Sequence, residues 1–216
     1  MAERERVRPP RSETRRRVLD AAFTTFGERG IAATSLNEVA AAAGLTKGAV
    51  YSNFASKDEL VLALMEEHVA HRLQVALAGF AEAEGEQALA NVAAVLVHEM
   101  RADATWHRLL AEYFALAAHD PDKQAALRAR RREARETITR ALIRIAEMLD
   151  DELPLPAPQF AVVLMALSNG LAVEAEIDPE AVPEDLLARV LTLIAGDVVG
   201  KIRHAAASVT VPPETP

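Results

Sequence analysis

Between residues 46 and 57 the chain offers small, polar and basic side chains at spacings that suit contact with a polyanion. Thr46 and Lys47 stand where a short helix would begin, so backbone amides and an ammonium group can meet a phosphate there. Gly48 and Ala49 are small and permit a close approach. Further polar groups follow at Tyr51, Asn53 and Lys57. The pattern therefore favours binding to a phosphate-bearing ligand.

Two short helices joined by Gly44-Leu45 would hold these residues. The sequence Ser35-Leu36-Asn37-Glu38 is a capping box that starts the first helix, and Thr46 can cap the second. A preceding helix is expected to end at Gly27 and Gly30. Three helices in this order form a helix-turn-helix unit, whose last helix enters the major groove of DNA. The alternative is that they are capped helices of an ordinary helical bundle.

The charge of the chain is unevenly distributed. The formal net charge is −8, yet residues 1–60 hold 10 Lys and Arg against 8 Asp and Glu, and the first 20 residues hold seven arginines. Because salt screens charges beyond about 8 Å, a basic head on an acidic body still binds a polyanion locally. The arginine-rich arm would either follow the DNA backbone and minor groove or remain uninvolved.

Composition predicts an all-α protein. Alanine accounts for 44 of 216 residues and aromatic residues for 4%, which favours helices over strands. There is no cysteine, which excludes disulfides, cysteine zinc sites and thiol nucleophiles. The longest apolar segment, residues 160–173, is too short to span a bilayer, so a soluble cytoplasmic protein is expected. The sequence carries no hydrolase, phosphate-loop or zinc-protease motif, so we expect no enzyme, no cofactor and no metal.

Residues 30–60 read GIAATSLNEVAAAAGLTKGAVYSNFASKDEL. This string resembles the DNA-binding domain of the TetR/AcrR family of transcriptional regulators, and with the first helix the resemblance extends over residues 12–62. It implies that Tyr51 and Lys57 contact phosphates. It also implies that Thr46, Lys47, Ala49 and Ser52 face bases or nearby phosphates. Ser52 is smaller than the aromatic residue often found there, and Asn53 replaces the commoner histidine. The predicted DNA-contacting residues are Thr34, Ser35, Thr46, Lys47, Gly48, Ala49, Tyr51, Ser52, Asn53 and Lys57.

The resemblance also implies the organisation of the whole chain. The expected fold is all-α with about nine helices, in which an N-terminal helix-turn-helix domain precedes a larger helical domain for ligand binding and dimerisation. The expected bounds are a basic flexible arm at 1–11, the helix-turn-helix domain at 12–56, a connector helix with the larger domain at 57–205, and a flexible tail at 206–216. The later helices are expected at about 57–80, 86–102, 104–118, 120–149, 159–177 and 183–205.

Two sets of residues in the larger domain follow from this organisation. Side chains that combine apolar bulk with polar tips are candidates for a small-molecule pocket, with ordinary core packing as the alternative: Met100, Trp106, Tyr113, Phe114, Phe160, Met165 and Asn169. The last two helices are expected to form a homodimer interface through Val162, Ala166, Val173, Leu187, Val190, Leu191, Ile194 and Val198.

These expectations describe a homodimeric transcriptional regulator. It would be a repressor that binds a palindromic double-stranded DNA operator and is released by a small-molecule effector. The alternatives are a transcriptional activator, or a constitutive DNA-binding regulator without an effector.

Overall fold

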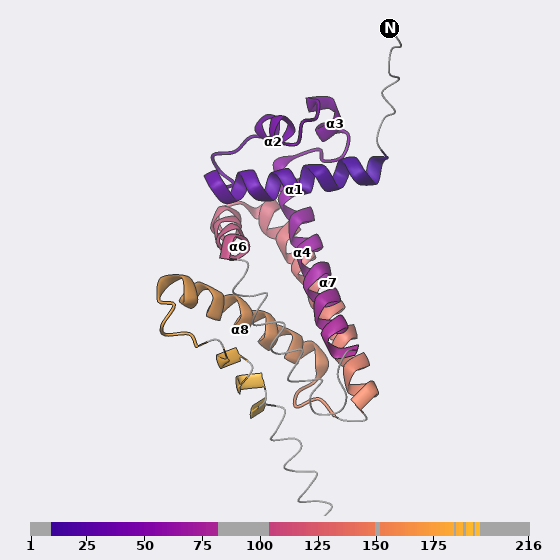
Figure 1. Ribbon diagram of the computed structural model, residues 1–216, viewed down its shortest axis with the longest axis vertical. Coiled ribbons are helices and arrows are strands. Elements are labelled where there is room, and N and C mark those ends of the chain that lie inside the picture. Colours follow the sequence, from indigo (N-terminus) through magenta and orange to yellow (C-terminus); the bar gives the residue numbers. More distant parts are fainter. Residues whose placement is uncertain are drawn as a thin grey trace, which may run out of the picture. The chain divides into compact units, whose positions relative to one another are not determined.

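The computed structural model describes residues 10–81, 104–149, 152–183, 185–187, 189–191 and 193–194. Over these residues the regular elements are helices: α1 (Arg11–Arg29), α2 (Leu36–Ala42), α3 (Lys47–Tyr51), α4 (Lys57–Ala81), α6 (Ala104–Ala117), α7 (Pro121–Leu149) and α8 (Ala157–Ile177) (Figure 1). Four of the later helices predicted from sequence are confirmed to within two residues at each end. The helix predicted at 183–205 is seen in part, as helical residues between 186 and 194. The helix predicted at 86–102, with Met100, and also Val198 lie outside the described residues.

The chain divides into two compact units that differ from the expected domains. The first comprises residues 1–70 and 105–131, and the second comprises residues 71–104 and 132–216. Over the described residues, the first unit therefore joins α1–α3 to the start of α4, to nearly all of α6 and to the first part of α7. Helix α6, which we had expected in the larger domain, packs with the helix-turn-helix instead.

The first unit has a single hydrophobic core. In Figure 1, α2 and α3 lie on the same side of α1. From α1 to α3 the core contains Val18, Phe26, Val39 and Val50, and α6 adds Trp106, Leu109, Leu110 and Tyr113. The segment Leu60–Met65 of α4 completes it. Because burying apolar area is the main driving force of folding, α6 and α4 help to stabilise the helix-turn-helix.

The predicted helix caps are confirmed. Ser35 and Glu38 form the reciprocal capping box of α2, and the Thr46 side chain accepts a hydrogen bond from the Ala49 N–H at the start of α3. Ser56 Oγ accepts from the Glu59 N–H at 3.0 Å. The Glu59 carboxylate returns to the Ala55 N–H at 2.7 Å, one residue before the position that a capping box requires.

Of the two glycines predicted to end helix α1, Gly30 does so and Gly27 does not. The helix continues through Gly27 to Arg29, and Gly30 ends it with a φ of 83°, a backbone conformation that favours glycine. Gly27 has a different role. A Cβ placed on it would lie 2.5 Å from Thr105 Cγ2, so glycine is needed there for the close approach of α1 to the start of α6.

The second unit contains the end of α7 and helix α8. Leu142 of α7 packs on Phe160 and Ala161 of α8, and Ala172 packs on Leu187. Helix α8 has 21 residues and, by length and composition alone, is long and apolar enough to cross a membrane, with 22% of its apolar window buried. The apolar segment 160–173, which we judged too short to span a bilayer, is part of this longer helix. A core helix of a soluble protein passes the same test.

The contact between Gly27 and Thr105 leads to a stability prediction. Gly27→Ala should lower the free energy of unfolding by about 1–3 kcal/mol, because the added methyl group overpacks a tight helix contact. In a Thr105→Ser background, which removes the Cγ2 atom, Gly27→Ala should be neutral or stabilising because alanine favours the helix. Urea unfolding of the four proteins measures the cycle.

Gly48→Ala serves as the matched control, because nothing lies within 4 Å of a Cβ built there. If Gly27→Ala and Gly48→Ala shift the urea midpoint in the same direction and by the same amount, the close approach of α1 to α6 is wrong.

Candidate nucleic-acid interface

Nine of the ten predicted contact residues line two hollows on either side of α3. The first hollow, of about 810 Å³, also borders the first turn of α1 through Arg11 and Thr14. It contains Thr46, Gly48, Ala49, Ser52 and Asn53. The second, of about 450 Å³, lies beside the turn that precedes α2, and contains Thr34, Ser35, Tyr51 and Lys57. The tenth residue, Lys47, is exposed at the start of α3, and its ammonium group has no partner among the described residues.

One side of helix α3 packs into the core, and its other side is exposed to solvent. Val50 and Phe54 are completely buried, whereas Tyr51 is 50% exposed. Thr46, Lys47, Gly48 and Ser52 are exposed as well. Since residues four apart share a helix face, Lys47 and Tyr51 form one flank of α3, and Gly48 and Ser52 form the middle of its exposed side. A short helix held in this way presents its polar side chains as a rigid surface.

Ser52 and Asn53 both turn back onto their own helix. The Ala49 carbonyl oxygen accepts from Ser52 Oγ at 2.9 Å and from Asn53 Nδ2 at 2.8 Å. Asn53 Nδ2 also donates to Ser52 Oγ at 3.4 Å. Ser52 thus has its only proton in use and offers an oxygen acceptor to an incoming group. Asn53 donates to a phosphate only by releasing its long bond to Ser52.

Three arginines of α1 contact the helix-turn-helix itself. Arg11 donates to the Ser52 carbonyl at 3.2 Å, at the end of α3, and Arg17 donates to the Ala43 carbonyl at 2.8 Å, at the end of α2. Cations stabilise helix C-termini, where backbone carbonyls lack partners. The guanidinium of Arg15 lies 4.6 Å from the centre of the Phe54 ring. Arg11, Arg15 and Arg17 therefore hold α2, α3 and the segment that follows them.

Thr34 is a correction to the predicted set. Its side chain is 1% exposed, and its hydroxyl donates to the Gly30 carbonyl at 2.8 Å. A buried hydroxyl that is already hydrogen-bonded does not reach a phosphate. Thr34 therefore belongs to the turn between α1 and α2. No pattern in the sequence distinguishes it from its exposed neighbour Ser35.

Lys57 also faces the protein. Its ammonium donates to three backbone carbonyls of the same turn, those of Ile31 at 2.6 Å, Ala32 at 3.2 Å and Thr34 at 3.0 Å. An ammonium has three protons, so these bonds use all of them. The phosphate contact predicted for Lys57 would have to replace one of these bonds.

Glu112 of α6 also contacts this turn, although no sequence pattern indicated it. Its two carboxylate oxygens accept from the backbone amides of Ile31 and Ala32, each at 2.9 Å. The partners are about 80 residues apart in the chain, and no local pattern connects a single acidic residue on one helix to the amides of a distant turn. Only the packing of α6 beside α1 brings them together.

Trp106 and Tyr113 lie on the same face of α6, as predicted, but that face packs into the core. They are 5% and 0% exposed. The Trp106 ring stacks on His68 of α4, with 4.0 Å between ring centres. Burial, followed by the nearby Asp58 carboxylate, raises the pKa of Tyr113 to about 12. In this structure both residues act as core residues, which was the alternative to a place in an effector pocket.

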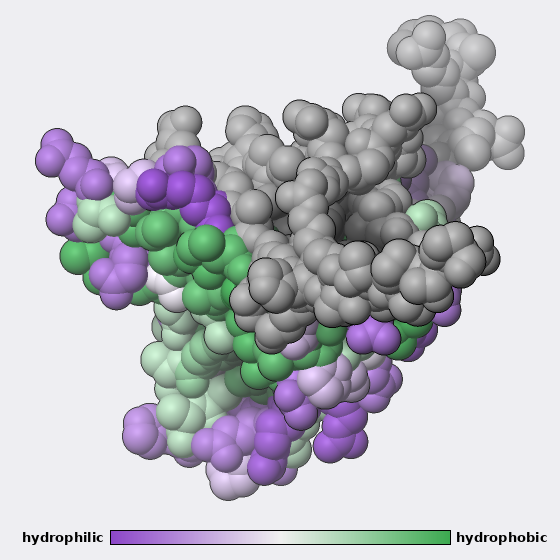
Figure 2. Space-filling view, turned by 90° about the horizontal axis from the view of Figure 1, so that it is seen from below, coloured by the Kyte–Doolittle hydropathy of each residue, from purple (hydrophilic) through white to green (hydrophobic). Residues whose placement is uncertain are grey.

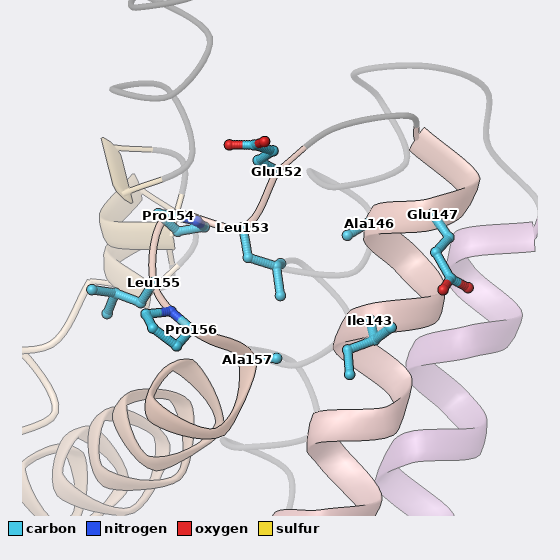
Figure 3. Close-up of a pocket in the computed structure, with 9 residues that line it drawn as sticks. All are labelled: Ile143, Ala146, Glu147, Glu152, Leu153, Pro154, Leu155, Pro156 and Ala157. Carbon is cyan, nitrogen blue, oxygen red and sulfur yellow. The ribbon is translucent and has the colours of Figure 1, made fainter.

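The remaining pocket candidates are divided between the units. In the first unit, the Phe114 ring receives the guanidinium of Arg131 at 5.6 Å. In the second, Phe160 and Met165 are each 8% exposed and Asn169 is half-buried. A separate open hollow of about 690 Å³ lies between the end of α7 and residues 152–157 (Figure 3). Leu153 and Ile143 face this hollow from its two sides, while the carboxylates of Glu147 and Glu152 are at its rim.

The predicted dimer residues behave in two ways. On α8, Val162 and Val173 are 49% and 40% exposed, Ala166 is exposed, and Ile177, which we had not selected, is 74% exposed. Their spacing places all four on one face, so they form an apolar stripe, called here the α8 stripe. Figure 2 shows hydrophobic residues gathered in a band on the side of the molecule seen from below.

The residues that follow α8 need a correction. Leu187 is 1% exposed and packs on Ala172 of its own chain. Leu191 and Ile194 pack on the same helix. These side chains therefore stabilise the fold of one subunit, whereas Leu193 on the same segment is 74% exposed. The sequence pattern selected the apolar face correctly but not the partner that covers it.

Comparison with known proteins gives one consistent result. Residues 18–64 match the model of a family described as bacterial regulatory proteins, tetR family. The chain is 33% identical over 96 residues to the HTH-type transcriptional regulator AcrR of Shigella flexneri, which covers 44% of each chain. The match thus spans less than half of this curated relative. The curated proteins that the chain matches are transcriptional regulators and not enzymes.

Two solved structures extend the likeness over most of the chain. A transcriptional regulator from Rhodococcus sp. Rha1 has a TM-score of 0.65 and 26% identity, over 87% of this chain and 96% of that one. The multidrug binding protein EbrR, solved in complex with imidazole, has a TM-score of 0.61 and 27% identity, over 90% of this chain and 97% of that one.

Proposed function

Because the chain belongs to the TetR family of bacterial regulatory proteins, we propose that it represses transcription as a homodimer that binds a palindromic DNA operator and leaves it when a small-molecule effector binds. The observation that carries this proposal is the exposed side of α3, where Lys47, Tyr51 and Ser52 face solvent while Val50 and Phe54 are buried. A protein of this kind works in the cytoplasm, where its DNA is.

The two kinds of residue on α3 have different tasks. Lys47 and Tyr51 lie on one flank of α3 and are placed for phosphates, which position the protein but carry no sequence information. Ser52 and Thr46 line the hollow beside the first turn of α1, where they can contact the edges of bases. Because the Ser52 hydroxyl donates its proton to the Ala49 carbonyl, Ser52 can only accept a hydrogen bond from a base. The amino groups of adenine and cytosine are donors of the required kind.

The first functional prediction concerns the operator. Selection from a random pool of duplex DNA should recover an inverted repeat with half-site centres about 34–36 Å apart, or a multiple of one helical turn. Lys47→Ala should weaken binding to all sequences and lower the slope of log affinity against log salt by about 1. Ser52→Ala should change the preferred bases and leave the salt slope unchanged.

Two results would contradict this assignment. Selected DNA without dyad symmetry excludes a symmetric dimer with one recognition helix per subunit. A Lys47→Ala protein that changes base preference at an unchanged salt slope would reverse the roles of Lys47 and Ser52. Tyr51→Phe serves as a companion variant, since it keeps the ring and removes only the hydroxyl.

The α8 stripe supports the homodimer. Four exposed apolar residues on one helix face are a surface that association would cover, and a symmetric pair of such faces buries the same residues on both subunits. Val173→Glu should therefore give a monomer in sedimentation velocity and abolish binding to the full inverted repeat, because one head alone contacts one half-site. Met148→Glu, a substitution of a comparably exposed apolar residue on α7, should remain dimeric. A dimeric Val173→Glu protein would move the interface away from α8.

The effector response is supported by likeness to EbrR, whose structure is described as that of a multidrug binding protein. Trp106 is the only tryptophan of the chain, and it joins α6 to α4 through its stacking on His68. An effector that moves these helices should therefore change Trp106 fluorescence at the concentrations that release DNA. Operator DNA must then weaken effector binding by the same factor. Release of DNA with unchanged Trp106 emission would exclude a movement of α6 against α4.

A further inference from the structure

We propose that Lys57 and Glu112 are positioning residues of the nucleic-acid interface, which hold the turn between α1 and α2 from two sides, and that Lys57 is not a phosphate contact. The turn comprises Gly30–Thr34, and we call the pair with its bonds the turn clamp. The consequence for binding rests on the DNA-binding function proposed above, whereas the clamp itself can be measured without DNA.

Glu112 holds the amide side of the turn. Its two oxygens accept one bond each from the consecutive amides of Ile31 and Ala32, both at 2.9 Å. A carboxylate that accepts two backbone N–H groups fixes their direction as well as their distance, and bonds to a charged acceptor are stronger than neutral ones. Gly30 leaves room for this contact, because a Cβ at that position would lie 3.2 Å from Glu112 Oε1.

Lys57 holds the carbonyl side. Three carbonyl oxygens, those of Ile31, Ala32 and Thr34, converge on its one nitrogen at 2.6–3.2 Å. Ile31 is held on both sides, since its amide binds Glu112 and its carbonyl binds Lys57. The Ile31 side chain is 2% exposed, so this part of the turn is also anchored in the core.

The position of the turn determines the positions of α2 and α3. Ser35, the cap of α2, directly follows Thr34, and α2 packs on α3. A shift of the turn therefore moves the start of α2, and with it the exposed side of α3. The two clamp residues come from α4 and α6, which are outside the helix-turn-helix. The next residue of α4, Asp58, accepts from Lys123 of α7 at 2.8 Å, so the base of α4 is fixed in turn.

The first test separates positioning from phosphate contact by charge-conserving substitution. A phosphate contact survives Lys57→Arg, because a guanidinium binds phosphate well. The clamp does not survive it, because a planar fork cannot place one donor nitrogen among three converging carbonyls. We expect Lys57→Arg and Lys57→Met to weaken DNA binding to a similar extent, by about tenfold or more, since both leave backbone groups of the turn without partners.

Salt dependence provides the second readout of the same variants. A bound phosphate releases counterions, so removing its contact lowers the slope of log affinity against log salt by about 1. Lys47→Met should show this drop and Lys57→Met should not, although both lose one positive charge. Retained binding in Lys57→Arg, together with a lower slope in Lys57→Met, would overturn the proposal for Lys57.

For Glu112→Gln, the turn clamp and simple electrostatics predict opposite changes in DNA affinity. Removing a negative charge from a DNA-binding surface ordinarily strengthens binding. The clamp predicts weaker binding, by about fivefold or more, because the amide offers one oxygen to two N–H groups and leaves one of them unpaired. Glu28→Gln, at an exposed carboxylate of α1, is the matched control and should bind as well as the wild type or better. Equal or stronger binding by Glu112→Gln would overturn the proposal for Glu112.

Hydrogen exchange keeps the clamp testable if the DNA-binding function fails. Measured on the full chain without DNA, the amides of Ile31 and Ala32 should exchange faster in Glu112→Gln than in wild type, while the interior amides of α1 are unchanged. If the wild type selects no sequence and does not bind nonspecific duplex DNA at low salt, the proposed function is wrong, and slow exchange of these two amides would still establish the clamp. Fast exchange in the wild type would overturn it.

Discussion

Five backbone groups of the turn between α1 and α2 are hydrogen-bonded by side chains from other helices, and the arrangement of the first unit depends on these bonds. The amides of Ile31 and Ala32 bind a carboxylate, and three carbonyls bind an ammonium. Burying such groups without partners costs several times the net contribution of one hydrogen bond. Helices α4 and α6, which lie outside the helix-turn-helix, supply the partners, so the turn before α2 is held by both of them.

Other side chains of the first unit also hold α2 and α3 in place. Arg11 and Arg17 bind the carbonyl ends of α3 and α2, and Val50 and Phe54 anchor α3 from beneath. Positive charge near the interface is thus partly used to hold the scaffold, and only Lys47 stands free on α3.

In the second unit, some apolar residues form the core and others are exposed on a neighbouring face of α8. Phe160, Ala161, Leu187 and Leu191 close the core of the subunit, while the α8 stripe remains exposed. Exposed apolar residues of this number on one helix face favour association of identical subunits, and twofold symmetry would match the dyad of a palindromic operator. Assembly and DNA recognition would then share one symmetry axis.

The sequence by itself determined the local structure of this protein. Capping residues, glycines and apolar periodicity indicated the helices and the helix-turn-helix to within two residues, because caps and helix faces are set by neighbours in the chain. Tertiary structure decided which faces meet which partners. It buried Thr34, turned Lys57 towards the turn, placed Gly27 against Thr105 and brought Glu112 to two distant amides. The contacts of Lys57, Gly27 and Glu112 join residues 23 to 81 positions apart in the chain. Hydrophobic periodicity indicates that a helix face is buried, but it does not indicate which element packs on that face.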